Sequence, residues 1–84
     1  MVVETVDDPV EVLTLFREGR IEPKRFKWKG RVIRVRRVTG DWSTRAGRDR
    51  ILHFAIQGEN ADYFEIAYHL TSHRWRLKRV WVDG

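Results

Sequence analysis

Residues 24–42, KRFKWKGRVIRVRRVTGDW, constrain the fold more than any other stretch of the chain. Phe26 and Trp28 alternate with basic residues, which is the period of a strand with one buried face. Lys29-Gly30 then supplies a two-residue turn, because glycine adopts positive φ at little cost. Val and Ile return at strand spacing after the turn. The segment therefore predicts a β-hairpin that is apolar and aromatic on one face and cationic on the other.

The short turn also determines which residues face each other across the hairpin. A two-residue loop places Phe26 opposite Ile33 on the apolar face and Arg25 opposite Arg34 on the cationic face. Like charges in facing positions destabilise a strand pair. Three explanations remain open: the two guanidinium groups extend into water, a third strand brings a carboxylate, or the face is arranged for a polyanion.

Positive charge is concentrated in one part of the chain. The net charge is +5, yet residues 17–50 hold thirteen bases and four acids, whereas residues 1–16 hold four acids and no base. Segregated positive charge favours an anionic partner. The alternative explanation is an arginine-rich surface with many ion pairs, as thermophilic proteins have.

Length and composition predict one small cytoplasmic domain. The chain has 84 residues and no cysteine, so it forms neither a disulfide nor a thiolate metal site. No apolar run approaches the roughly 20 residues that a membrane span needs. The N-terminus lacks the basic and apolar regions of a signal peptide, and we expect no membrane partner.

Residues 8–19 are compatible with two local structures. Asp8, Pro9 and Gly19 fit the N-cap, first turn and C-terminus of a helix. The β-branched residues at positions 10, 12 and 14 instead favour a strand at about 10–16. We predict the strand, keep a short helix as the alternative, and expect residues 1–8 to be disordered. Pro23 cannot donate to a ladder, so its strand lies at an edge or carries a bulge there.

Three more strands are predicted at residues 51–57, 61–70 and 73–82. Residues 39–50 are predicted as a loop, with continuation of the preceding strand into Trp42 as the alternative. Residue parity selects a three-residue connection, Glu59 to Ala61, which pairs Ile56 with Phe64. A two-residue turn at 71–72 then pairs core and outer positions of the last two strands, namely Tyr68 with Trp75, Ile66 with Leu77 and Glu65 with Lys78.

Doubled cations before a valine, Arg36-Arg37 and Lys78-Arg79, indicate two β-bulges that curl the sheet. The prediction is therefore an all-β domain, an antiparallel meander of five to six strands curled into a small open barrel. Its predicted core comprises Phe26, Trp28, Ile33, Val35, Val38, Leu52, Phe54, Ile56, Phe64, Ile66, Tyr68, Trp75, Leu77 and Val80.

The sequence offers little to catalysis. Its three histidines include His69 and His73, which flank a turn, whereas zinc needs three or four converging ligands. There is neither a nucleophile elbow nor a phosphate-binding P-loop. We expect a non-enzymatic protein without metal or cofactor.

Basic strands and one aromatic-containing loop instead predict nucleic-acid binding. Small β-barrels bind single strands by combining cations with aromatic rings on which bases stack. For Trp42 the alternative is a structural role, capping the open end of the barrel. We expect salt-sensitive contacts to the backbone of single- or double-stranded nucleic acid. The predicted contacts are Arg25, Lys27, Arg34, Arg36, Trp42, Arg45, Arg48, Arg74 and Arg76.

A protein-interaction module is the competing class of function. The strand at 10–16, as an edge strand with an acidic tail, would accept a strand from a partner. Tyr63 and Trp81 would form the apolar centre of such an interface.

The aromatic spacing of the chain carries a resemblance. Phe26-x-Trp28-x-Gly30-Arg31, Trp42, Phe64-Glu65-Ile66 and Trp75-x-Leu77-x-x-Val80-Trp81 resemble a family of short bacterial all-β proteins with no assigned function. Some of its members lie near genes for Y-family translesion DNA polymerases. The resemblance implies an all-β fold over about residues 9–82 and favours a role related to DNA.

Overall fold

The computed structural model describes residues 2–60 and 62–82, and all of its regular structure is strand. The predicted all-β fold is confirmed, and residues 8–19 adopt a strand rather than a helix. Within the described ranges, no helix is long and apolar enough to cross a membrane. The strands are β1 (Val2–Arg17), β2 (Arg20–Trp28), β3 (Arg31–Ala46), β4 (Asp49–Gly58), β5 (Tyr63–His69) and β6 (Arg74–Val82).

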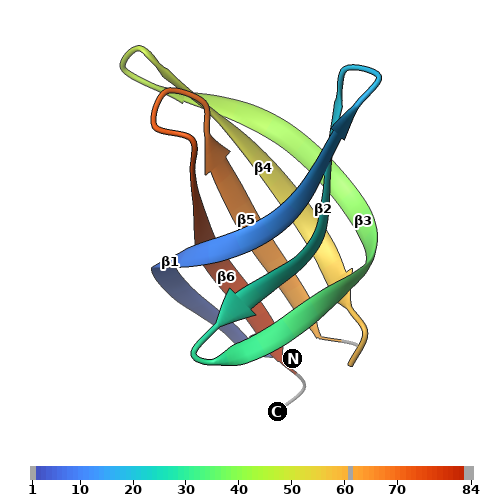
Figure 1. The fold of residues 1–84 in the computed structure, drawn as a ribbon. Helices are drawn as coiled ribbons and strands as arrows, with labels where there is room; N and C mark the ends of the chain where they lie inside the picture. Colours follow the sequence, from blue (N-terminus) through green and yellow to red (C-terminus); the bar gives the residue numbers. More distant parts are fainter. Residues whose placement is uncertain (1, 61, 83–84) are drawn as a thin grey trace.

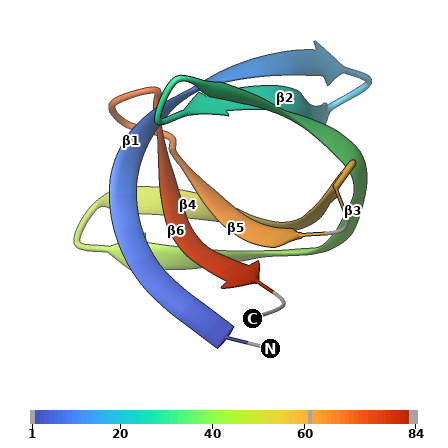
Figure 2. The ribbon, with the colours of Figure 1, turned by 90° about the horizontal axis from the view of Figure 1, so that it is seen from below.

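Each strand pairs antiparallel with the next, and β1 also pairs with β6, so the meander closes into a barrel (Figures 1 and 2). The expected barrel was open. Closure depends on residues 2–8, which were expected to be disordered and instead form the part of β1 that pairs with β6. The indole Nε1 of Trp28, at the end of the neighbouring strand β2, donates to Asp8 Oδ2 at 2.9 Å and helps to fix this segment.

The barrel interior holds the predicted core with one exception. The residues that are fully buried include Phe26, Ile56, Ile66 and Leu77, and the other predicted positions are buried or pack against this cluster. Val38 is the exception, because 42% of its surface is exposed. It pairs with Ile56 and faces inward, but β2 no longer lies beside β3 at that height.

The predicted registers follow from turn length and parity, and the predicted core pairings are confirmed where the structure describes them. Phe26 pairs with Ile33, Ile56 with Phe64, and Tyr68 with Trp75. Ala61, the last residue of the predicted β4–β5 connection, lies outside the described residues. A register shift separates the Arg25 and Pro23 pairings with β1, which agrees with the predicted bulge near Pro23.

The β6 bulge is also confirmed, but its pairing differs from the prediction. Lys78 is skipped, so Glu65 faces Arg79 and not Lys78, and Val80 moves inward opposite Phe64. In β3 the ladder shifts at Arg36, as expected, and a second time at residue 39.

Residues 39–46, predicted as a loop, continue β3 and pair with β4. Strand parity does not predict this part of β3, because two register shifts within five residues remove the alternation of inward and outward side chains.

β2 and β3 pair only from Arg25–Arg34 to Trp28–Arg31. Beyond that point β2 continues with β1 alone, and β3 continues with β4 alone. The β1–β2 and β3–β4 hairpins therefore diverge at one end of the barrel (Figure 1). This divergence opens the wall of the barrel between β2 and β3.

Candidate nucleic-acid interface

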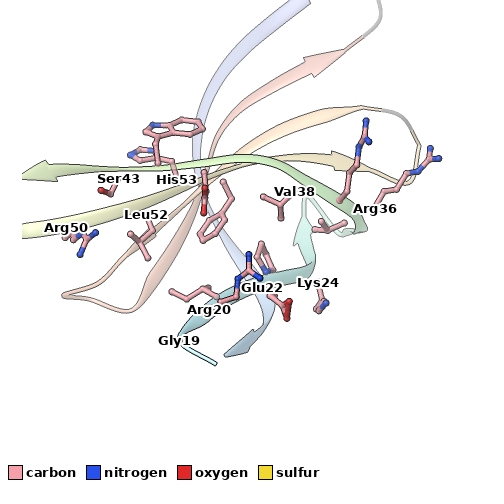
Figure 3. Close-up of a pocket in the computed structure, with 17 residues that line it drawn as sticks. Gly19, Arg20, Glu22, Lys24, Arg36, Val38, Ser43, Arg50, Leu52 and His53 are labelled. Atoms are coloured by element: carbon pink, nitrogen blue, oxygen red, sulfur yellow. The ribbon is translucent and has the colours of Figure 1, made fainter. Parts of the chain in front are cut away.

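The opening between the diverging strands is a groove of 660 Å³, here called the β2–β3 groove. Figure 3 shows Arg20 and Lys24 on the β2 side and Val38 and Leu52 on the facing sheet. Phe54 completes an apolar floor. The groove therefore combines polar rims with an apolar base.

Bases outnumber acids along this groove. Arg20 and Lys24 come from β2, Arg36 and Arg37 from β3, and Arg50 from β4. None of these five forms an ion pair with any residue of the described chain. Arg37 donates from Nε to the neutral Gln57 Oε1 at 3.0 Å.

The groove also contains two acids, Glu22 and Asp41. Glu22 is already engaged, because its Oε2 lies 2.9 Å from Arg17 Nε. The charge that remains along the rims is therefore mainly positive, and positive potential in a cleft attracts anions.

A second hollow, of 630 Å³, lies on the outer face of β1, β2 and β3. Arg25, Lys27 and Arg34 line it, and the predicted pairing of Arg25 with Arg34 is confirmed. On the other side β1 places Leu13 opposite Arg25, so no third-strand carboxylate faces this residue. Glu11 and Glu59 are also in the lining, but no described ion pair involves the three bases.

The linings of the two hollows follow each other directly in the chain, at Lys24–Arg25 on β2 and at Arg34–Val35 on β3. The basic side chains of the two linings are here called the cationic band. It consists of Arg20, Lys24, Arg25, Lys27, Arg34, Arg36, Arg37 and Arg50.

The structure brings some of the predicted contacts together and separates others. Arg25, Lys27, Arg34 and Arg36 all belong to the cationic band. Arg45 faces Arg50 across β3 and β4, and Arg48 lies in the turn beyond them. Arg74 and Arg76 lie on β6, which pairs with β1 and β5 and not with the strands of the band.

Arg76 has an acidic partner within the chain, Asp7. Its Nε lies 2.8 Å from Asp7 Oδ1, and Lys78 Nζ lies 3.0 Å from the same oxygen. The hydrogen bond from Arg76, together with that from Lys78, holds the pKa of the Asp7 carboxyl below its ordinary value of 3.8. Two of the bases on the second basic strand, Arg76 and Lys78, are therefore already paired with one internal carboxylate, that of Asp7.

Sequence reasoning missed Arg20, Lys24, Arg37 and Arg50 as members of the same surface. They converge only because β2 and β3 separate, and strand parity carries no signal for that separation. The doubled cation at Arg36-Arg37, which indicated a bulge, was the one available signal.

Trp42 does not cap the end of the barrel. It lies on the outer face of β3, pairs with His53 and is 44% exposed. Its ring stacks on the His53 imidazole, with centroids 5.2 Å apart and an angle of 2° between the planes. Trp42 and His53 are both among the residues that line the β2–β3 groove, and in Figure 3 the His53 ring projects from the sheet on the side away from Arg20 and Lys24.

His53 is held by two hydrogen bonds. Its Nδ1 lies 3.2 Å from Glu65 Oε2, and its Nε2 lies 2.7 Å from Thr44 Oγ1. An ionised carboxylate only accepts, so Nδ1 carries a proton and donates to Glu65. Arg79 donates from Nη1 to the other Glu65 oxygen at 2.5 Å. Glu65 and His53 are buried, although both face outward from the barrel.

A hydroxyl, an imidazole and a carboxylate in this order also occur in hydrolases. A hydrolase needs in addition a concave site with hydrogen-bond donors for the oxyanion. Thr44 does not line the β2–β3 groove. In this fold the chain of contacts fixes the ring beneath Trp42. Across residues 2–60 and 62–82, no three His, Cys, Asp or Glu side chains are grouped to hold a metal.

The structure also describes both parts of the competing protein-interaction surface, the strand at 10–16 and the pair Tyr63 and Trp81. β1 pairs with β6 over Val2–Val10 and with β2 over Glu11–Arg17, so among the described residues positions 11–16 of the predicted edge strand have a ladder partner on one side only. Tyr63 and Trp81 face each other across β5 and β6, and with Ala55 they line an apolar hollow of 320 Å³.

The fold and this surface define a small basic β-barrel protein of six strands whose cations gather where two strands part. The chain belongs to the family described as a domain of unknown function, DUF6504, whose model matches residues 1–82. No curated protein and no solved structure matches the chain.

Proposed function

We propose that the protein is a non-enzymatic nucleic-acid-binding module whose cationic band contacts the phosphate backbone. One observation carries this proposal: β2 and β3 separate, and basic side chains without ion-pair partners among the described residues line both sides of the opening. Phosphates neutralise such clusters and release condensed counterions, which supplies much of the affinity for nucleic acid.

The geometry of β3 favours nucleic acid over an added peptide strand in the groove. An unpaired strand edge attracts other strands, and bulges and charges on that edge prevent the addition. The β3 edge along the groove carries two register shifts and the cations Arg36 and Arg37. Side-chain contacts to a polyanion need no regular ladder, so they tolerate these bulges.

The test is a titration of labelled oligonucleotides, single- and double-stranded, at about 50 mM and about 200 mM salt. Wild type is expected to bind, and its affinity is expected to fall as salt rises. Arg34→Glu with Arg36→Glu should abolish binding at the higher salt. The matched control is Arg76→Glu with Lys78→Glu, which changes the net charge equally on β6. This control should retain most of the affinity.

Two outcomes would contradict the proposal. The first is absence of binding even at the lower salt. The second is equal loss in the two double variants, which would mean that net charge and not the cationic band governs attraction. Thermal unfolding of each variant establishes that the comparison concerns folded protein.

A protein partner at the Tyr63–Trp81 hollow is the second candidate. The observation that favours it is the apolar lining of this hollow on the outer face of the barrel. Aromatic residues in apolar hollows are typical centres of protein interfaces. Trp81→Ser should then prevent capture of a specific protein in a pull-down, whereas Trp42→Ser should not.

A further inference from the structure

We propose that Trp42 is a stacking platform for a nucleobase and that it makes the protein selective for single strands over duplexes. This inference rests on the proposed function and adds the class of nucleic acid. It depends on three features of the structure: the open face of the indole, the contacts that fix it, and its position on the same strand as the phosphate-binding cations.

One face of the Trp42 ring is covered and the rest is accessible. The His53 imidazole lies parallel beneath the indole, at an angle of 2°. The side chain is nevertheless 44% exposed, so the accessible surface is the outward face and the ring edges. Exposed indoles are uncommon on monomeric surfaces, and a flat ring with one free face suits a base of any identity.

The indole is fixed before any ligand arrives. Thr44 and Glu65 hold the two nitrogens of His53, and Arg79 holds the second oxygen of Glu65. Because His53 and Glu65 are buried, their rotamers are restricted and the plane of the stack is restricted with them. A ring that is already ordered loses little conformational entropy when a base stacks on it. Glu65 and His53 are therefore positioning residues for Trp42.

Trp42 lies on the same strand as the cations. Arg34, Arg36 and Arg37 precede it on β3. From Arg37 to Trp42 the strand covers about 17 Å, at roughly 3.3 Å per residue. Single-strand-binding domains of this size contact about 4–16 nucleotides, so phosphate contacts and one base contact fit within a single site.

Selectivity for single strands follows from the accessibility of base faces. In a duplex each base is stacked on its neighbours, and only the groove edges and the backbone face outward. A ring that already has His53 stacked on one face does not insert between two paired bases, because insertion requires both faces. It therefore adds affinity only for a strand whose bases are free to unstack.

The experiment compares Trp42→Leu with wild type for an oligothymidine of about 12 nucleotides and for a duplex of equal length. The single-strand affinity should fall about 5- to 100-fold, and the duplex affinity should stay the same. Trp81→Leu is the matched control, because it removes an indole from β6. That control should change neither affinity.

The positioning role has its own test. His53→Ala should reduce single-strand affinity without affecting the duplex, and His53→Phe, which restores a flat ring beneath the indole, should recover part of the loss. In the Trp81→Leu background three tryptophans remain, and Trp42 is the exposed one, whereas Trp75 is buried and Trp28 half-buried. Quenching of their fluorescence by oligothymidine that is absent from Trp42→Leu with Trp81→Leu reports stacking on a protein whose His53 is intact. That measurement remains informative if either His53 variant fails to fold.

The results separate this inference from the proposed function. If Trp42→Leu lowers single-strand and duplex affinity equally, or lowers neither affinity, the inference that bases stack on Trp42 is wrong. Neither result contradicts the proposed phosphate contacts of the cationic band. If wild type binds no nucleic acid at the lower salt, both are wrong.

Discussion

Reversing the charge of Arg34 should stabilise the fold and weaken nucleic-acid binding at the same time. Arg34 faces Arg25 across β2 and β3, and neither has an acidic ion-pair partner in the described chain. Cross-strand charge pairs change stability by about 0.2–1 kcal/mol, with like charges unfavourable and opposite charges favourable. Arg34→Glu converts a facing pair of like charges into a facing pair of opposite charges.

Removing an unfavourable pair and adding a favourable one spans roughly 0.4–2 kcal/mol. Both side chains are exposed, so solvent screening keeps the gain in the lower half of that range. We expect the free energy of unfolding to rise by about 0.5–1 kcal/mol, which raises Tm by roughly 2–8 °C for a domain of this size. The gain should be largest at low ionic strength and should nearly vanish at about 1 M salt, where the Debye length is about 3 Å.

Thermal and urea unfolding at two salt concentrations measure this effect. Arg48→Glu is the control, because it has the same charge change in the β3–β4 turn, where no strand residue faces it. A lower Tm for Arg34→Glu at low salt would refute the reasoning, since it would mean that an attractive contact holds Arg34 in the wild type.

Three further predictions test the packing and electrostatics of the barrel. Ile66→Val, at a fully buried position, should lower the free energy of unfolding by about 1 kcal/mol in urea denaturation, and no change would mean that the core is loosely packed. Gly58→Ala should cost about 1–3 kcal/mol, because the new Cβ would lie 3.1 Å from Phe64 and 3.3 Å from Ile33, and a neutral result would show that β4 and β5 shift easily. Asp7→Asn should destabilise the protein slightly at neutral pH. The ion pairs of Asp7 stabilise the fold only when its carboxyl is ionised, so the substitution should have no effect once the pH falls below the lowered pKa of the native carboxyl. A destabilisation that persists in acid would exclude the ion pairs as its cause.

Strand parity and turn length predicted most of the barrel, because both are local properties. Lys29-Gly30 fixes the Phe26–Ile33 register, and the same reasoning places Tyr68 opposite Trp75. Parity fails where bulges interrupt the ladder. The shift at residue 39 resets the faces of β3, so residues 39–46 read as a loop although they pair with β4.

The candidate site was predictable only in part, for a related reason. Arg25, Lys27, Arg34 and Arg36 share a surface because they occupy one hairpin. The groove itself depends on where β2 leaves β3, and the position of that separation has no local signal in the sequence of either strand. Exposure of Val38 has the same origin.

The contacts that fix Trp42 join three strands and could not be read from any single one. His53 is on β4, Glu65 on β5 and Arg79 on β6. The expected partner of Glu65 was Lys78, and the bulge moved Arg79 into its place. A one-residue shift therefore decides which cation reaches the buried carboxylate.

The most direct test of the central claim is an amide chemical-shift map of the protein titrated with a single-stranded oligonucleotide. We predict shifts concentrated along Arg34 to Trp42 of β3 and Lys24 to Lys27 of β2, with β6 near Arg76 unchanged. Shifts confined to the Tyr63–Trp81 hollow, or the absence of any saturable shift at low salt, would contradict the account.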